Sequence, residues 1–187
     1  MMIHQKRKNA VVAVVVIMLL LTVCLLIGMP SSTPQYIQSA NLSKWNSQGP
    51  FNGKAGGWGP NAKGDWVAPA NFQGSYTWVV YSAPWCHTAA MQANTLKQLE
   101  TSTPGVNFIT VLTTGSSIDE SASLENAVSW ASNHSLPKTN VLASEQRLPL
   151  VSPRHLLYAA SGRAVFAHEG WMAPDEIMRT IQAIGAL

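Results

Sequence analysis

The sequence feature that most constrains the fold is an apolar run that ends at a tryptophan and a cysteine. Residues 78–81 are Trp, Val, Val and Tyr, and aromatic and β-branched residues at this density favour a buried β-strand. Trp85 and Cys86 follow after a short turn, and residues 88–101 have the composition of a helix. Because a helix N-terminus carries unpaired N–H groups and a partial positive charge, it favours the thiolate form of a cysteine placed there. The segment therefore predicts a strand, a turn and a helix with a reactive thiol at the junction.

The N-terminal segment predicts a membrane anchor. Residues 10–29 are apolar apart from Thr22, Cys24 and Gly28, and at about 1.5 Å per residue they span about 30 Å, the thickness of a bilayer core. The basic residues in the tail 1–9 place the N-terminus in the cytoplasm and the rest of the chain outside. A cleaved signal peptide is the alternative, but its apolar core is usually only about 7–15 residues and ends at a small-residue site.

Charge and cysteine content exclude several classes of function. Subtracting the three basic residues at 6–8 from 12 leaves nine, against nine acidic residues, so the exported part is neutral. No basic patch indicates nucleic-acid binding. Cys24 lies in the predicted anchor, and Cys86 stands alone beyond it, which excludes an internal disulfide there. A single cysteine in an oxidising compartment indicates an intermolecular bond or a reactive thiol.

Beyond the tail 1–9 and the anchor 10–29, the sequence divides into a Gly/Pro/Trp-rich linker at 30–74 and a domain at 75–187. Trp45, Trp58 and Trp66 are unusual in a flexible tether, so we expect partial packing of the linker on the domain, with an edge strand at 66–67. The domain follows the order β-α-β-α-β-β-α, typical of an α/β layered fold. Strands are expected at 76–82, 106–112, 155–159 and 164–168, and helices at 88–101, 119–133 and 174–184.

This order of elements and the Trp85-Cys86 motif together resemble the thioredoxin superfamily, and within it the membrane-anchored TlpA-like branch. The resemblance covers residues 74–187 and includes Ser152 and Pro153 before a strand and Gly162 in the terminal hairpin. It implies a thioredoxin-like fold, with a central mixed sheet flanked by helices, behind an N-terminal transmembrane helix. It also makes Pro153 the cis-proline that faces the cysteine, with Pro149 as a competing candidate. A cis-proline turn presents its backbone to an extended peptide bound beside the thiol.

Two positions depart from the family pattern. Ala89 stands where the family has its second cysteine, which leaves a degenerate Cys-x-x-Ala motif, and Val80 stands where it has a buried carboxylate. Without a second thiol in the chain, a mixed disulfide at Cys86 is released only by the client's own second thiol or by an external thiol such as glutathione.

The predicted function is thiol–disulfide exchange, or isomerase-like handling of envelope client proteins, by a single-pass inner-membrane protein with a periplasmic domain. The alternative is a non-catalytic interaction module of the same fold, with an inert cysteine, in an envelope assembly such as a secretion or conjugation system. Trp85 is expected to be exposed and to contact the peptide, while His87 and Arg154 would favour the thiolate. The candidate residues are catalytic Cys86 and substrate-binding Trp85, His87, Ser152, Pro153 and Arg154.

No metal or other cofactor is expected. Cys86, His87 and His155 could come near one another, but adjacent Cys and His residues rarely share one ion, and no C-x-x-C or H-x₃-H spacing occurs. The partners expected for either function are envelope proteins, held by a mixed disulfide or in a peptide groove, together with the inner membrane and no nucleic acid.

Overall fold

A computed structural model describes residues 58–144 and 152–185, which belong to one compact unit. The predicted anchor at 10–29, Trp45 and Pro149 lie outside the described residues. Among the helices within the described ranges, none is long and apolar enough to cross a membrane.

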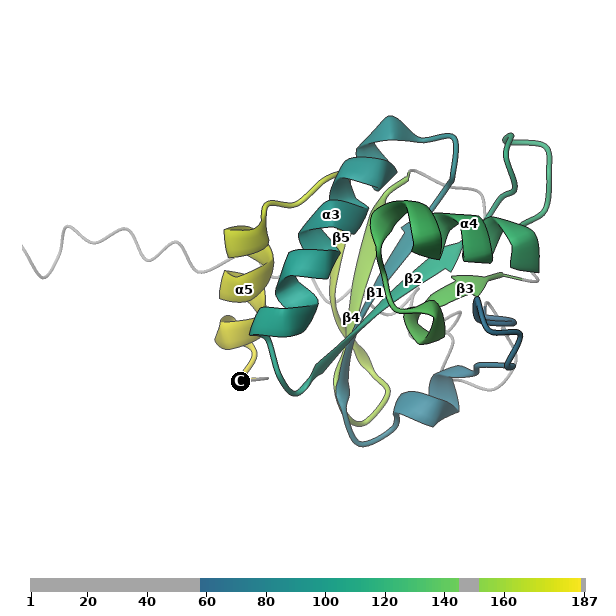
Figure 1. Ribbon diagram of the computed structural model, residues 1–187. Helices are drawn as coiled ribbons and strands as arrows, with labels where there is room; N and C mark the ends of the chain where they lie inside the picture. Colours follow the sequence, from purple (N-terminus) through teal and green to yellow (C-terminus); the bar gives the residue numbers. More distant parts are fainter. Residues whose placement is uncertain (1–57, 145–151, 186–187) are drawn as a thin grey trace, which may run out of the picture. The chain divides into compact units, whose positions relative to one another are not determined.

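Five strands form one mixed sheet in the order β3-β2-β1-β4-β5 (Figure 1). β1, β2 and β3 are parallel to one another, and β4 runs antiparallel to both β1 and β5. The four strands predicted from the sequence are present, and β3 is an additional one, too short for its periodicity to be visible. The strands are β1 (Tyr76–Ser82), β2 (Val106–Leu112), β3 (Val141–Ala143), β4 (Arg154–Tyr158) and β5 (Ala164–Glu169).

The three helices are α3 (His87–Ser102), α4 (Leu124–His134) and α5 (Pro174–Ala183). In Figure 1, α3 and α4 lie in front of the sheet, and α5 lies to the left of α3. Because the chain steps from β1 to β2 to β3 in one direction, right-handed crossovers put α3 and α4 on the same face. Two short 3-10 helices, η1 (Pro69–Phe72) and η2 (Lys138–Asn140), complete the elements.

Helix α4 begins at Leu124 rather than at residue 119 as predicted. The reason is a capping box: the Ser123 side chain accepts the N–H of Asn126, and the Asn126 side chain accepts the N–H of Ser123. This pair satisfies two N–H groups that the helix itself leaves unbonded. Residues 113–123 are therefore a loop that leads from β2 to α4.

The side chains of β1 alternate between two apolar clusters. Trp78 and Val80 face the cluster that α3 and α5 cover, whereas Val79 and Tyr81 face the opposite side of the sheet. Such two-sided burial is expected of a central strand with parallel neighbours. Each fully buried apolar side chain stabilises the fold by about 1.5–3 kcal/mol, so this strand anchors the turn that follows it.

The opposite side of the sheet packs against residues that precede β1. Trp58 is 1% exposed and meets Phe72 edge to face, with ring centroids 5.5 Å apart. Val67 and Phe72 are half-buried against the same cluster. The part of the predicted linker that the structure describes thus contributes a core tryptophan.

Residues 60–62 run along the outer edge of β3. The N–H of Ala143 donates to the carbonyl of Pro60 at 3.0 Å, and the N–H of Ala62 donates to the carbonyl of Val141 at 2.9 Å. Trp66 is 57% exposed and forms only an isolated bridge with Pro60, so the edge strand expected at 66–67 is not formed.

Candidate functional site

Cys86 lies at the junction of β1 and α3. Its N–H donates to the carbonyl of Ala83 at 2.9 Å, which closes the turn, and its carbonyl accepts the N–H of Ala90 at 3.2 Å, which starts the helix. Cys86 is thus the N-cap residue of a 16-residue helix whose first turn contains no acidic side chain. The free N–H groups of that turn favour negative charge on the sulfur.

Ser152 connects the thiol to the start of β4. The Ser152–Pro153 peptide bond is cis, the geometry that the family resemblance implies for Pro153. The Cys86 thiol donates to the carbonyl of Ser152 at 3.3 Å, and the Ser152 hydroxyl accepts the N–H of Ala83 at 3.0 Å. The hydrogen bond from sulfur exists only while the thiol is protonated, so the thiolate must rely on the N–H groups of α3 instead.

Trp85 and His87 flank the thiol on the surface. The Trp85 side chain is 45% exposed, and its Nε1–H donates to the Thr114 hydroxyl at 3.0 Å, which fixes the ring over the end of β2. His87, the first residue of α3, is also exposed. An incoming peptide therefore meets an indole whose orientation is already set, which lowers the entropy lost on binding.

Arg154 does not face the thiol as a free charge. Its guanidinium pairs with the carboxylate of Glu169, the residue opposite it across the β4–β5 ladder. A charge paired with Glu169 attracts a third group less strongly, so the effect of Arg154 on a thiolate stays a prediction and is expected to be smaller.

The two positions that depart from the family pattern are both deeply buried. Ala89, where the second cysteine would stand, has no exposed surface and packs in a cluster with Ala93 and Leu112. Val80 is equally buried among apolar side chains. Within the described residues, the interior beside Cys86 therefore offers neither a second thiol nor a carboxylate at these positions.

His155 is a site residue whose role could not be read from the sequence. Its side chain is fully buried; Nδ1 accepts the indole N–H of Trp78 at 3.0 Å, and Nε2 lies 3.0 Å from the carbonyl of Gly170. Since Nδ1 accepts, the proton must be on Nε2, which donates to Gly170. Burial, with a smaller contribution from nearby His168, lowers the pKa of His155 to about 3. The only sequence signal was a histidine two residues after Pro153.

The loop between β5 and α5 completes this side of the site. The N–H of Gly170 donates to the carbonyl of Pro153 at 2.8 Å, and φ of +98° at Gly170 favours glycine. The Gln92 side chain of α3 bonds both the N–H (2.8 Å) and the carbonyl (3.3 Å) of Met172. Trp171 lies between Gly170 and Met172, and its side chain is 42% exposed.

The described residues contain no group of three or more His, Cys, Asp or Glu side chains that could hold a metal ion. His155 has both ring nitrogens in hydrogen bonds to protein atoms, so it cannot ligate an ion without breaking them. The site has the groups that thiol chemistry requires: the Cys86 sulfur as a nucleophile, the N-terminus of α3, and the backbone of Ser152 and Pro153 beside them.

No protein-family profile and no curated protein sequence matches the chain. Solved structures do match. A secreted Mycobacterium tuberculosis disulfide oxidoreductase homologous to E. coli DsbE has a TM-score of 0.52 at 21% identity, over 70% of this chain and 95% of that chain. MTB DsbF has a TM-score of 0.54 at 18% identity, over 68% and 93%. The exposed lipoprotein thioredoxin Etrx1 of Streptococcus pneumoniae has a TM-score of 0.52 at 16% identity, over 67% and 96%.

Identities this low are informative about the fold rather than about activity. The architecture of this chain is the mixed five-stranded sheet with its flanking helices, and Cys86 lies at the start of α3. The described residues of this chain therefore adopt a thioredoxin-like fold, similar to that of known thiol:disulfide oxidoreductases.

Proposed function

We propose that this chain carries out monothiol thiol–disulfide exchange at Cys86 on client proteins of the cell envelope. The observation that carries the proposal is the position of the sulfur, at the start of α3 and 3.3 Å from the carbonyl oxygen of Ser152. An extended client segment lying along Ser152 and Pro153 would bring its disulfide to the Cys86 sulfur. The likeness to thiol:disulfide oxidoreductases supports the same chemistry.

In the proposed reaction, the Cys86 thiolate attacks one sulfur of a client disulfide. A bond forms between Cys86 and that sulfur, the client S–S bond breaks, and the second client sulfur leaves as a thiolate. Ala89 supplies no resolving thiol, so release requires a client thiolate to attack the mixed disulfide, which returns Cys86 and leaves a client disulfide. Attack by an external low-molecular-weight thiol is the other route, and it leaves the client bound to that thiol.

The proposed location is the inner membrane. Residues 10–29 would form a single span with a cytoplasmic N-terminus and a periplasmic domain, supported by the apolar length of that segment and the basic residues at 6–8. Two structurally similar proteins are described as secreted and as an exposed lipoprotein, respectively.

The test is to trap mixed disulfides in the native host. Cells are acid-quenched, alkylated and analysed on non-reducing gels beside Cys86→Ser and Cys24→Ser strains. Reductant-sensitive bands should appear in the wild type and in Cys24→Ser and be absent from Cys86→Ser, and mass spectrometry of the bands identifies the clients. A free-thiol monomer in every strain would refute the exchange function.

The second candidate is a non-catalytic interaction module that uses the same groove. The pairing of Arg154 with Glu169 favours it, because that pairing reduces support for a thiolate. This function predicts that Cys86→Ser is silent in vivo. It also predicts that substitution of exposed Trp66 impairs the assembly. Substitution of buried Trp58 would damage the fold under both functions and so could not distinguish them.

A further inference from the structure

Gly170, at the start of the loop between β5 and α5, has both of its backbone polar groups held by the segment 153–155. Its N–H donates to the carbonyl of Pro153 at 2.8 Å, and its carbonyl lies 3.0 Å from Nε2 of His155. Because His155 Nδ1 accepts the indole N–H of Trp78, Nε2 carries the proton and donates to Gly170. The start of β4 and one glycine of the loop therefore close a small ring of hydrogen bonds.

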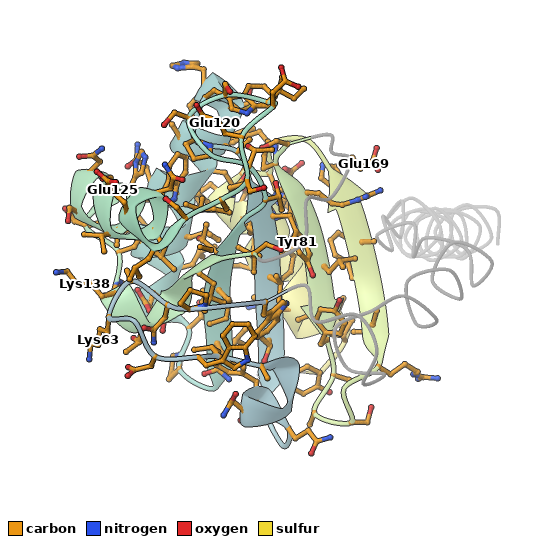
Figure 2. The ribbon with its side chains drawn as sticks, turned by 90° about the vertical axis from the view of Figure 1, so that its right-hand side faces the viewer. Lys63, Tyr81, Glu120, Glu125, Lys138 and Glu169 are labelled. Carbon is orange, nitrogen blue, oxygen red and sulfur yellow. The ribbon has the colours of Figure 1, made fainter. Side chains whose placement is uncertain are left out.

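This ring lies at the same end of the sheet as the thiol. Because β1 and β2 are parallel, the turn that carries Cys86 and the loop that carries Glu120 leave the sheet at the same end. Figure 2 shows Glu169, which precedes Gly170 in the chain, toward the same end of the molecule as Glu120. The thiol itself donates to the carbonyl of Ser152, the residue directly before the ring.

The turn that precedes β4 is held from two sides. On the side of β1, the N–H of Ala83 donates to the Ser152 hydroxyl at 3.0 Å. On the side of β5, the N–H of Gly170 donates to the Pro153 carbonyl. His155 in turn fixes Gly170 through the glycine carbonyl. The orientation of the peptide group that follows Pro153 therefore depends on an imidazole two residues further along the chain.

The imidazole of His155 lies in apolar surroundings. It has no exposed surface, its partner across the β1–β4 ladder is Val80, and its ring centroid lies 5.9 Å from that of Trp78. An apolar side chain would fill this space without the cost of burying two ring nitrogens. It could not, however, supply a directional bond to the Gly170 carbonyl. A buried polar network in which every member is bonded makes the local geometry rigid, and this is the property that the imidazole adds.

The far end of the same loop is held independently of His155. The Gln92 side chain of α3 bonds both the N–H and the carbonyl of Met172. Loss of the bond between His155 and Gly170 would therefore release the glycine without detaching the loop from α3. The effect of such a loss is confined to the segment that lies beside the turn at 152–153.

We propose that His155 is a positioning residue for the exchange reaction: its Nε2–H holds Gly170, and through Gly170 the backbone of Pro153, in the orientation that a client segment needs beside Cys86. The imidazole contacts neither the client nor the sulfur. It sets the backbone surface before the client binds, which lowers the entropy lost on binding. The proposal rests on the proposed exchange function and names a side chain on which client binding at that site depends.

The test uses the full-length chain with Cys24→Ser, so that Cys86 is its only thiol. The two probes are N-acetylcysteinamide and a short peptide with one cysteine, each as a mixed disulfide with nitrothiobenzoate. Cys86 forms a disulfide with the probe sulfur, and the bond to nitrothiobenzoate breaks. The coloured nitrothiobenzoate thiolate leaves, and the Cys86 proton goes to water, so absorbance reports the rate. The ratio of the peptide rate to the N-acetylcysteinamide rate, which we call the peptide advantage, measures client positioning separately from thiol reactivity.

Two amide side chains at position 155 separate the two hydrogen bonds of the imidazole. The amide of His155→Asn reaches about as far as Nδ1 and can accept from Trp78, whereas the amide of His155→Gln reaches about as far as Nε2 and can donate to Gly170. We expect a peptide advantage of about tenfold in the Cys24→Ser chain, about the same in His155→Gln, and about twofold in His155→Asn. The rate with N-acetylcysteinamide should change by less than about twofold in both variants, because the sulfur keeps its own contacts.

Two further variants complete the design. Ile109→Val shortens a fully buried side chain on the opposite face of the sheet, and it should leave the peptide advantage unchanged if general loss of stability is not the cause. Trp78→Phe removes the donor to His155 Nδ1, so the imidazole is less firmly oriented, and the advantage should fall about threefold. This variant tests the same network should His155→Asn fail to fold.

The two probes distinguish failure of the positioning role from failure of the exchange function. Equal peptide advantages in His155→Gln and His155→Asn, or no peptide advantage in the Cys24→Ser chain, would overturn the positioning role while leaving the exchange function intact. No release of nitrothiobenzoate from either probe would refute the exchange function, and the positioning role with it.

Discussion

The first turn of α3 has two sides that differ in how completely their polar groups are paired. On one side, which we call the proline side (residues 152–155 and 170–172), His155, Pro153 and Gly170 form a closed set of hydrogen bonds. On the other, which we call the α4 side (residues 113–134), the indole N–H of Trp130 is buried without an acceptor among the described residues. A fully paired side fixes geometry, whereas a buried donor without an acceptor costs stability.

The contrast is clearest in two buried tryptophans. Trp78 is completely buried, and its indole N–H has an acceptor in His155. Trp130 is 5% exposed, and its indole N–H has none in the described part of the chain. The two buried indoles thus differ in whether the N–H is hydrogen-bonded to another side chain.

The largest effect should come from lowering the pH, which reduces the free energy of unfolding through His155 on the proline side. The folded-state pKa of His155, about 3, is below its ordinary value of 6.5, so folding favours the neutral ring. Its contribution is complete above pH 6.5 and is lost as pH falls from 6.5 towards 3, at up to about 1.4 kcal/mol per pH unit. Urea unfolding of wild type and His155→Gln at pH 7, 5.5 and 4.5 gives the free energy of unfolding at each pH. If it falls by the same amount in both proteins, His155 is not the cause of the acid sensitivity.

Next in size is the effect of restoring a thiol at the buried position 89. Ala89→Cys places a resolving group in the same chain, where attack on a mixed disulfide is intramolecular, so its lifetime should fall on the order of 100-fold or more. Trapped bands seen with wild type should fade in Ala89→Cys but persist in Ala89→Ser, which makes a similar change in volume without a thiol. Equal trapping in both variants would show that position 89 cannot reach Cys86.

The same substitution in the two tryptophans compares the two sides directly. Trp78→Phe leaves His155 Nδ1 without a donor, whereas Trp130→Phe removes a group that already lacks a partner. The free energy of unfolding should therefore fall about 1–3 kcal/mol more for Trp78→Phe. Urea unfolding at pH 7 checks this, and equal losses would mean that the Trp130 N–H has an acceptor in the folded protein.

The smallest effect should come from the link between Trp85 and Thr114. Trp85→Phe and Thr114→Val each remove one partly buried hydrogen bond, and each should cost about 0.5–1.5 kcal/mol or less. A double-mutant cycle by urea unfolding tests whether the two losses arise from the same bond. Fully additive losses would argue that this bond does not hold the indole in place.

The elements that sequence periodicity predicts are the ones with strong local signals. The strands 76–82 and 106–112 match the structure at both ends, because each is rich in β-branched and aromatic residues. The three-residue β3 escaped prediction, because it depends on a partner distant in the chain, whereas the packing expected for the linker is found at Trp58. The start of α4 was misplaced because the Ser123–Asn126 capping pair was overlooked.

The thiol end of the site could be predicted, since Cys86 and Pro153 belong to local motifs with a known arrangement. The residues that hold the site together could not. Trp78 and His155 are 77 positions apart, and Gln92 and Met172 are 80 apart. A single sequence carries no mark of such pairs.

The covering of β3 by residues 60–62 has a consequence for the order of folding during synthesis. The segment leaves the ribosome about 80 residues before the strand it covers. Until residues 141–143 follow, the N-terminal segment has no sheet edge to pair with, and contacts so distant in sequence form slowly. A chain truncated before β3 would therefore expose an unpaired edge of β2.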